Sequence, residues 1–340
     1  MSAKRRKGKA SHRPRMTPPP GALGKRARLG PFEVGARIGG GGMASIHLGR
    51  SVLDRGEVVA LKIVKSELTR DPRYVDMFRD EAAILSRMDH PNIVRTLEFG
   101  VADDRRYIAM ELLLGRTLAE VFDAAIEKGA PLDPAWVAWI GARVASALDY
   151  AHELVDEHGA PLKIVHRDAN PANIVLGYDG NVTLIDFGLA KAARRVARTE
   201  DGIVKGKVPY LAPEQILEDE VDARTDVFTL GASLWEILTL RRLFKRETDL
   251  ETIRAIRDER VPDLAVAAPS CPPALATVVM RALAPTRAER FGSAAELEIE
   301  LDGVFGRDDD ATRAALAAYV ERLFPGEGAD RARWRTSIDL

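Results

Sequence analysis

The stretch KIVHRDANPANIVLGYDGNVTLIDFG, residues 163–188, decides the fold of this 340-residue chain. Runs of branched apolar residues flank the polar segment HRDANPAN, and the Asp179-Gly-Asn turn predicts a hairpin between two short strands. Asp168 and Asn173 in the first loop, and Asp186 at the end of the last strand, should therefore lie on neighbouring loops. Grouped hard oxygen ligands suit Mg²⁺, which takes one or two carboxylates and completes its shell with water and phosphates.

The composition is that of a globular protein with a substantial core. Hydrophobic residues make up 46% of the chain and charged residues 30%, which excludes disorder throughout. No run of about 18 apolar residues occurs and the basic start lacks the apolar centre of a secretory signal, so we expect a cytoplasmic protein without a membrane span. The single cysteine, Cys271, excludes an intramolecular disulfide and agrees with a reducing compartment.

The first 30 residues form a basic arm. They contain ten of the 50 lysines and arginines, no acidic residue and three consecutive prolines. With almost no large apolar side chains the arm cannot repay the entropy of ordering, and we expect disorder. A solvated arm is the plainest interpretation; an acidic or nucleic-acid partner is the alternative, although the arm lacks interleaved aromatic residues for base stacking.

From Pro31 onward the sequence contains short runs rich in β-forming residues, separated by glycine or charged turns. Strands are expected in FEVGARI, SIHLGRS, EVVALKIV, IVRTLEFGV and RRYIAMELL. Between the third and fourth runs, Asp71 is a good N-cap and apolar residues recur at spacings of three or four up to Met88, which predicts one helix. The pattern indicates a small antiparallel sheet with one helix packed on it.

Glycines 39–42 lie between the first two predicted strands, in IGGGGMAS. Glycine lets the backbone approach phosphates and point its N–H groups at them. The spacing lacks the last glycine of G-x-G-x-x-G, and the hairpin context argues against a Rossmann fold. Lys62 lies in the next apolar run, where an ammonium is costly to bury without an anion, and Glu81 is a candidate partner. A strand-edge lysine and a surface glutamate are the alternatives.

Taken in order, these motifs resemble those of the eukaryotic-like (Hanks-type) serine/threonine protein kinases of bacteria. The set is IGGGGMASI, VALK, Glu81, HRDANPAN, DFG, APE at 212–214, DARTDVFTLG and RF at 290–291. Each motif is modest alone, but their order and spacing together are specific.

That resemblance implies an α+β, bilobal fold over residues 31–302. The N-lobe, residues 31–112, would be mainly antiparallel sheet with one helix, and the C-lobe, residues 113–302, mainly helical. Residues 303–340 form an extension in which Ala315, Leu316, Tyr319, Val320 and Leu323 predict one amphipathic helix, expected to pack on the large lobe.

The resemblance also implies that ATP binds between the lobes with Mg²⁺, or Mn²⁺ as an alternative, and that a protein is the substrate. Asp168 would accept the proton of the substrate hydroxyl, while Lys62, paired with Glu81, would hold the α and β phosphates. Asn173 and Asp186 would ligate the metal. The residues expected to bind ATP are Ile38, Gly39, Gly40, Gly41, Gly42, Ile46, Ala60, Lys62, Met110, Glu111, Leu113 and Val175.

Structural roles follow from the same resemblance. Glu214 is expected to pair with Arg290 in the core, where each charge would be costly to bury alone. A stack of side chains anchored by Asp226 is expected to couple the lobes; its members would be Phe187, His166, Leu85 and Leu97.

Two positions depart from the family pattern. Asn170 stands where such kinases usually have a lysine that contacts the γ phosphate, and Lys207 stands where a docking-loop threonine is expected. We hypothesise that the Lys207 ammonium takes the place of the missing lysine and that Asn170 supplies a hydrogen bond. In the loop between DFG and APE, Thr199 is the expected phosphorylation site, with Arg167 as the partner of its phosphate.

Three functions of different classes therefore remain open. An active kinase is favoured by the presence of all five residues Lys62, Glu81, Asp168, Asn173 and Asp186. A pseudokinase would bind nucleotide or partners without phosphate transfer, and the altered positions 170 and 207 keep that alternative open. A nucleic-acid binder would use the basic arm.

Overall fold

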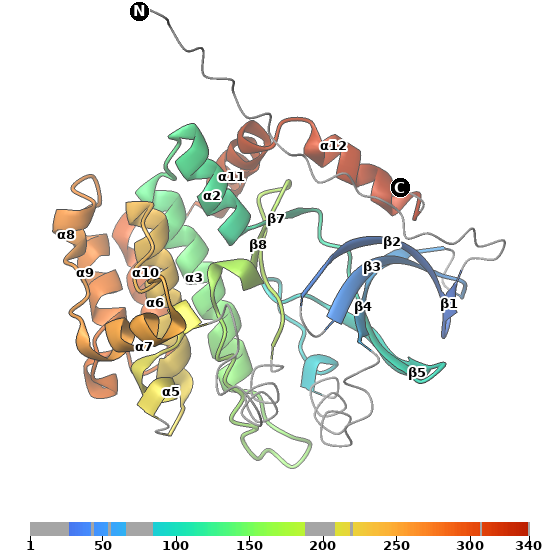
Figure 1. Ribbon diagram of the computed structural model, residues 1–340, viewed down its shortest axis with the longest axis horizontal. Helices are drawn as coiled ribbons and strands as arrows, with labels where there is room; N and C mark the ends of the chain where they lie inside the picture. The colour runs from blue at the N-terminus through green and yellow to red at the C-terminus, as the bar shows by residue number, and fades with distance from the viewer. Residues whose placement is uncertain are drawn as a thin grey trace, which may run out of the picture.

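The computed structural model shows two lobes, one mostly β-sheet and one mostly helical (Figure 1). Residues 111–114 lead from β6, the last strand of the sheet along the chain, into the helical lobe. The structure describes residues 27–41, 44–53, 56–65, 84–187, 208–217, 220–306 and 308–338.

The small lobe is a six-stranded antiparallel sheet in the order β1-β2-β3-β4-β6-β5. The five predicted strands are confirmed, because each apolar run between turn residues has become one strand. Val58–Val64 is buried along its whole length, as expected of a central strand. The strands are β1 Arg28–Leu29, β2 Phe32–Gly40, β3 Ala44–Ser51, β4 Val58–Val64, β5 Thr96–Ala102 and β6 Arg105–Met110.

The boundary of the basic arm at residue 30 was wrong by a few residues. Arg28 and Leu29 form strand β1, which pairs with β2, and Leu29 is buried beside Phe32 in the core of the sheet. Burial of this one apolar side chain orders the end of the arm. Residues 1–26, and with them the predicted disorder and the acidic or nucleic-acid partner, lie outside the described residues.

The large lobe is built around α3 and α6. The predicted start of α3 is confirmed: Asp133 caps the helix by accepting a hydrogen bond of 2.8 Å from the Ala135 N–H, and Pro134 occupies the first turn. The elements are β7 Gly115–Thr117, α2 Leu118–Lys128, α3 Pro134–His152, η2 Pro171–Asn173, β8 Ile174–Gly177, β9 Val182–Leu184, η3 Val208–Tyr210, α5 Pro213–Leu217, α6 Ala223–Thr239, α7 Asp249–Asp258, α8 Leu264–Ala267, α9 Pro273–Ala282, η4 Arg287–Glu289 and α10 Ala294–Phe305.

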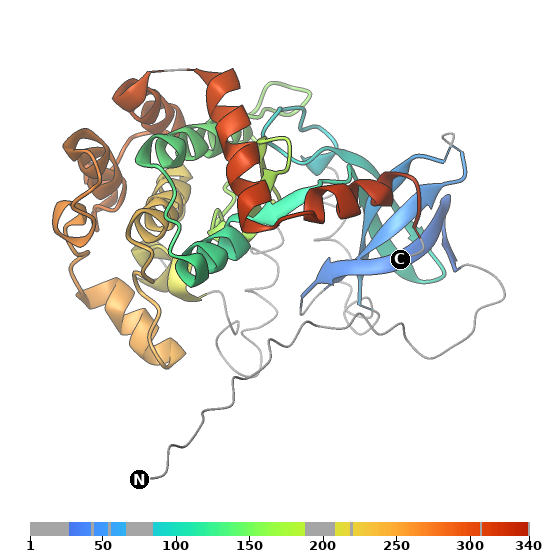
Figure 2. The same ribbon diagram turned by 90° about the horizontal axis from the view of Figure 1, so that it is seen from above.

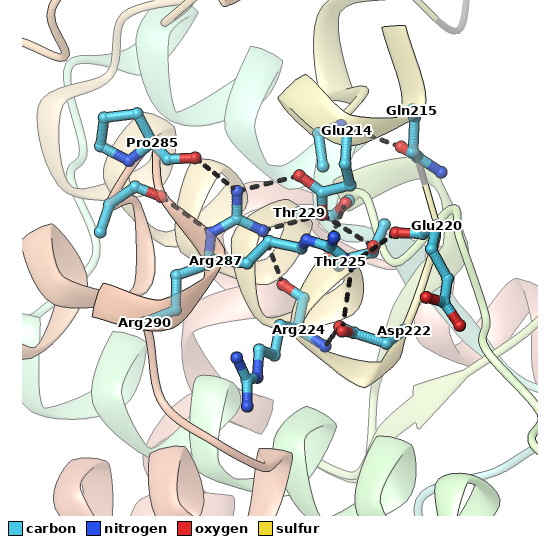
Figure 3. Close-up of polar contacts among 12 residues, drawn as sticks. Glu214, Gln215, Glu220, Asp222, Arg224, Thr225, Thr229, Pro285, Arg287 and Arg290 are labelled. Carbon is cyan, nitrogen blue, oxygen red and sulfur yellow. Dashed lines mark hydrogen bonds and ion pairs between the residues drawn. The ribbon is translucent and has the colours of Figure 1, made fainter. Parts of the chain in front are cut away.

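A buried ion pair between Glu214 and Arg290 confirms the predicted core contact (Figure 3). The two guanidinium nitrogens Nη1 and Nη2 reach the two carboxylate oxygens at 2.8 and 3.0 Å. The other three N–H groups of Arg290 donate to the carbonyls of Ala284, Arg224 and Pro285, so all five donors are satisfied. Burial alone would raise the pKa of Glu214, but the Arg290 guanidinium overcomes this and lowers it.

Of the predicted interlobe stack, the contact between His166 and Phe187 is confirmed. The rings of His166 and Phe187 meet edge to face with centroids 4.5 Å apart, and Leu85 is buried in the same core as Phe187. Leu97 is 36% exposed, because the alternation along β5 turns it outward and turns Thr96 toward the interior.

Beyond α10 the chain forms α11 Asp309–Leu323, α12 Glu327–Ala332 and the short η5 Arg333–Arg335. As predicted, α11 packs on the large lobe, where it contacts α2, α3 and β8. The chain then leaves the large lobe and runs beside the small-lobe sheet (Figure 2). None of the helices among the described residues has the length and apolarity to cross a membrane.

Candidate active site

The β8–β9 hairpin brings the three predicted polar groups together. The 3-10 turn η2 places Asn173 at the entrance to β8, and β9 returns the chain antiparallel beside it. The Ile185 N–H donates to the Asn173 carbonyl at 2.9 Å. The next residue, Asp186, therefore lies beside the HRDANPAN segment, residues 166–173, which is the predicted catalytic loop. The predicted grouping of Asp168, Asn173 and Asp186 on neighbouring loops follows from this hairpin.

The Asp168 carboxylate is held by an amide on each oxygen. Asn170 Nδ2 donates to Oδ1 at 2.5 Å, and Asn173 Nδ2 donates to Oδ2 at 2.9 Å. Asn170 is itself held, because its Oδ1 accepts from the Ala172 N–H at 2.8 Å. Asp168 and both asparagines are buried. The orientation of this carboxylate is therefore set by the loop that carries it.

Asp226 on α6 holds the backbone of the catalytic loop through hydrogen bonds. Its oxygens accept the backbone N–H groups of His166 and Arg167 at 2.8 and 2.6 Å. His152, at the end of α3, contacts the same carboxylate through Nε2 at 2.8 Å. One fully buried carboxylate thus joins α6, α3 and the catalytic loop.

His166 is held in the neutral form by its two neighbours. The Asp168 N–H donates to Nδ1 at 3.2 Å, so the other nitrogen, Nε2, carries the proton and donates to the Ile185 carbonyl at 3.1 Å. Burial of the ring lowers its pKa, which agrees with a neutral imidazole. Through His166 the Asp168 loop is connected to the strand that leads to Asp186.

Two residues of the site adopt left-handed backbone conformations that side chains other than glycine rarely take. Arg167 has φ of 66° and Asp186 has φ of 63°. Each such residue costs about 1–3 kcal/mol and persists only where its surroundings enforce it. Here the strained residues are Asp186 itself and Arg167, the neighbour of Asp168.

Lys62 on β4 reaches the Asp186 carboxylate. The Nζ to Oδ1 distance is 2.6 Å, and the lysine is buried. The predicted need of this ammonium for an anion is confirmed. Glu81, its predicted partner, lies outside the described residues, and the contact with Asp186 was not predicted.

The predicted adenine slot is assembled by strand register. Ile46 lies opposite Lys62, and Ala60 lies opposite Met110. Val175 on β8 is buried at the start of the large lobe. The residues predicted to line the adenine slot therefore come from both lobes.

The glycine loop and the connection between the lobes were both predicted to contact ATP. A side chain at Gly40, where φ is 129°, would lie 2.7 Å from the Ala44 carbonyl, whereas a side chain at Gly41 would meet open space. In the described parts of the chain no hydrogen bond engages the Glu111 carbonyl or the Leu113 N–H. These groups fit a flat polar ring; Gly42 lies outside the described residues.

Residues 32–298 match the family described as the protein kinase domain. The chain belongs to the protein kinase family. The chain of this kinase is 38% identical over 302 residues to "Tyrosine-protein kinase MasK" of Myxococcus xanthus, covering 88% of this chain and 44% of that protein. It is 33% identical over 287 residues to "Serine/threonine-protein kinase PrkC" of Bacillus subtilis, covering 84% and 42%.

Solved structures agree with the bilobal fold of the kinase. The kinase domain of PknI from Mycobacterium tuberculosis matches with a TM-score of 0.64 and 27% identity, covering 83% of this chain and 99% of that one. The predicted relationship to bacterial Hanks-type kinases is therefore confirmed. The kinase spans less than half the length of the curated relatives described above.

Sequence reasoning missed a polar network next to the docking loop of the kinase. Tyr210 donates to Glu236 at 2.7 Å, and Arg242 Nη1 contacts both, at 2.6 and 3.0 Å. Burial, followed by the charge of Glu236, raises the pKa of Tyr210, so the hydroxyl stays protonated and donating. The signal in the sequence was a glutamate within the apolar run SLWEIL, since such a charge needs a partner.

Proposed function

We propose that this kinase transfers the γ-phosphate of ATP to serine and threonine hydroxyls of proteins. The observation that carries the proposal is the oriented carboxylate of Asp168 beside the Lys62–Asp186 ion pair, whose two halves are 124 residues apart in sequence. An acceptor hydroxyl beside Asp168 would give up its proton to that carboxylate. The amides of Asn170 and Asn173 would hold the base still during the transfer.

ATP and a divalent metal are the cofactors we propose. The fit rests on the open backbone groups of Glu111 and Leu113, and on the hard oxygen donors of Asn173 and Asp186. A bound Mg²⁺ would neutralise the phosphate charge. Lys62 would contribute a second positive charge, and positioning together with neutralisation would supply most of the catalysis.

The decisive experiment incubates the purified chain with Mg-ATP and a general protein substrate, and maps phosphosites by mass spectrometry. Asp168→Asn is the matched negative control. We expect phosphoserine and phosphothreonine in the wild type and neither in the variant. Because one relative is named a tyrosine kinase, phosphotyrosine alone would contradict the serine/threonine assignment. Nucleotide binding without transfer would identify a pseudokinase.

We further propose Thr199 as the site of loop phosphorylation. Thr199 lies outside the described residues, but its expected partner does not. Arg167 is partly buried, burial lowers its pKa, and no acidic side chain in the described parts of the chain forms an ion pair with it. A phosphate would supply the missing charge. An active preparation whose loop carries no phosphate would contradict this assignment.

The exchange of Lys207 for the missing lysine stays a proposal, because Lys207 also lies outside the described residues. Its support is that Asn170 donates to Asp168 and accepts from Ala172, so both ends of its amide are engaged within the loop. A cation for the γ-phosphate would then have to come from elsewhere. Lys207→Ala should reduce phosphate transfer; unchanged transfer would end the hypothesis.

A further inference from the structure

Residues 324–338, here named the strap, connect the end of α11 on the large lobe with the sheet of the small lobe. Figure 2 shows this segment, in dark red, running from the helical lobe to the blue strands. The strap lies on the side of the connection between the lobes and contacts both of them.

On the large lobe the strap is anchored to strands β7 and β8. Glu327 forms an ion pair with Arg116 and accepts a hydrogen bond of 3.2 Å from the Tyr178 hydroxyl. Arg331 donates to a backbone carbonyl of β7 at 2.5 Å. Arg116 and the Gly115 carbonyl of β7, together with Tyr178 directly after β8, therefore fix the first half of the strap.

On the small lobe the strap is held by its backbone. The Ala36 N–H of β2 donates to the Ile338 carbonyl at 2.9 Å, and Arg50 of β3 donates to the Thr336 carbonyl at 2.8 Å. The Ile338 side chain is fully buried against Leu48 and Val58. This end has the features of a docked peptide: main-chain hydrogen bonds beside one buried apolar anchor.

Gly35 provides independent evidence that the small lobe is shaped for the strap. A Cβ atom added at Gly35 would lie 2.3 Å from the Ile338 carbonyl oxygen and 2.6 Å from the Ile338 Cβ. Gly35 does not have a positive φ, so its backbone would accept alanine. The strap, and not the conformation of β2, is what requires glycine at this position.

The docked end of the strap touches two parts of the proposed nucleotide site. Ile38, expected at the adenine, and Leu112, in the connection between the lobes, both pack against the cluster that contains Ile338. A segment fixed on both lobes limits how far the lobes can rotate about that connection. Release of the strap should therefore weaken nucleotide binding at the proposed ATP site.

We propose that the strap is an intramolecular clamp, docked through Ile338 on the small lobe, that holds the two lobes in the orientation in which nucleotide binds. The docking does not depend on the proposed kinase activity, but the effect on nucleotide rests on the proposed ATP site.

Two substitutions release the strap from opposite sides, and both are made in the full chain. Ile338→Asp removes the apolar anchor from the strap, and Gly35→Ala blocks its seat on β2. The matched controls are Ile299→Asp, on an isoleucine that is 70% exposed, and Gly303→Ala, where an added Cβ meets nothing within 4 Å. Limited trypsin digestion reports docking, since Arg333 and Arg335 lie in the strap.

We expect trypsin to cut the strap about tenfold faster in both test variants and at the wild-type rate in the controls, since cleavage follows the undocked population. The Kd for ADP should rise by about 5- to 150-fold, the range typical of coupled sites. The Kd for ADP of the double variant should not exceed the larger of the two single-variant values, because both changes break the same contact.

Unchanged trypsin rates in both test variants would show that the strap does not dock, and would overturn the proposal. Faster cleavage with an unchanged Kd for ADP would show that the strap docks without affecting nucleotide binding, and would overturn its role as a clamp. A wild-type chain that binds no nucleotide would overturn the proposed ATP site and the coupling together, and the trypsin result would still decide docking.

Discussion

Asp168 illustrates how much of this site is decided by single side chains. Hydrogen bonds to charged groups contribute about 1.5–3 kcal/mol each, and the Asp168 carboxylate accepts one from each of two amides. Asn170, the departure from the family pattern, is one of the two donors. The position that carries a lysine in the family pattern therefore holds the carboxylate of Asp168, the proposed base.

Asp168→Asn should lower kcat by about 10²- to 10⁴-fold, because an amide cannot accept the proton of the acceptor hydroxyl. The Kd for ATP should change little, since nucleotide contacts are expected from other residues. Asp104→Asn, in an exposed turn at φ of 57°, is the matched control. Steady-state kinetics with isothermal titration measure both quantities; equal kcat in wild type and Asp168→Asn would remove the base from the mechanism.

Asn170→Ala should lower kcat by about 10- to 100-fold, in line with the loss of one charge-assisted hydrogen bond and the η2 cap. The KM for ATP should stay near the wild-type value, because Asn170 acts through Asp168. Glutamine at position 170 retains the amide and tests whether its placement matters. If Asn170→Ala has wild-type kinetics, the amide has no positioning role.

At the scale of elements, the ion pair of Glu214 and Arg290 joins α5 to the segment that follows η4 (Figure 3). Thr225, in the first turn of α6, adds a hydrogen bond of 2.7 Å to the same carboxylate. The Glu214 carboxylate therefore joins three segments that are far apart in sequence. Removing one partner would leave the other charge buried and unpaired.

Glu214→Gln should lower the free energy of unfolding by about 3–5 kcal/mol at pH 7. Because the folded pKa of Glu214 lies below its ordinary value, this contribution is present above the ordinary glutamate pKa and is lost as the pH falls through the folded value. Urea unfolding at pH 7 and at about pH 4 should show a smaller difference between the two proteins at the lower pH.

Glu300→Gln on the exposed side of α10 is the control for this experiment and should leave the free energy of unfolding within about 0.5 kcal/mol. A difference between wild type and Glu214→Gln that does not shrink as the pH falls would mean that the ionised carboxylate is not what stabilises the fold.

At the scale of the whole molecule, the two lobes meet at the proposed nucleotide site, and a ligand there should stabilise both. ATP with Mg²⁺ at about 100 times Kd should add about 2.7 kcal/mol to the free energy of unfolding, which for a 340-residue chain raises Tm by about 4 °C. In Asp186→Asn the part of the shift that depends on Mg²⁺ should disappear. Asparagine tolerates the left-handed backbone at this position.

Differential scanning fluorimetry with and without Mg²⁺ separates the two contributions. The wild type without metal provides the baseline, and Asp104→Asn should behave as the wild type. A full Mg²⁺-dependent shift in Asp186→Asn would show that Asp186 is not a metal ligand.

The strands, the start of α3 and the ordered motif residues were all predictable, because strand alternation and helix caps act between residues close in sequence. Two predictions failed at residues whose placement is set by strand pairing and alternation. Leu29 became ordered because it packs beside Phe32 on a paired strand, and Leu97 points outward because of the local alternation of β5. In residues 303–340 only the amphipathic helix α11 was predicted, and the strap that follows it was not.

By itself, the sequence determined the family, the order of the elements and the identity of the residues Lys62, Asp168, Asn173 and Asp186. Only the tertiary structure decided that the Asn170 amide donates to the Asp168 carboxylate. It also decided that Thr336 of the strap meets Arg50 of β3, from which it is separated by 286 residues in the chain. Residue type and periodicity are local properties, whereas a hydrogen bond between distant segments exists only once packing has brought them together.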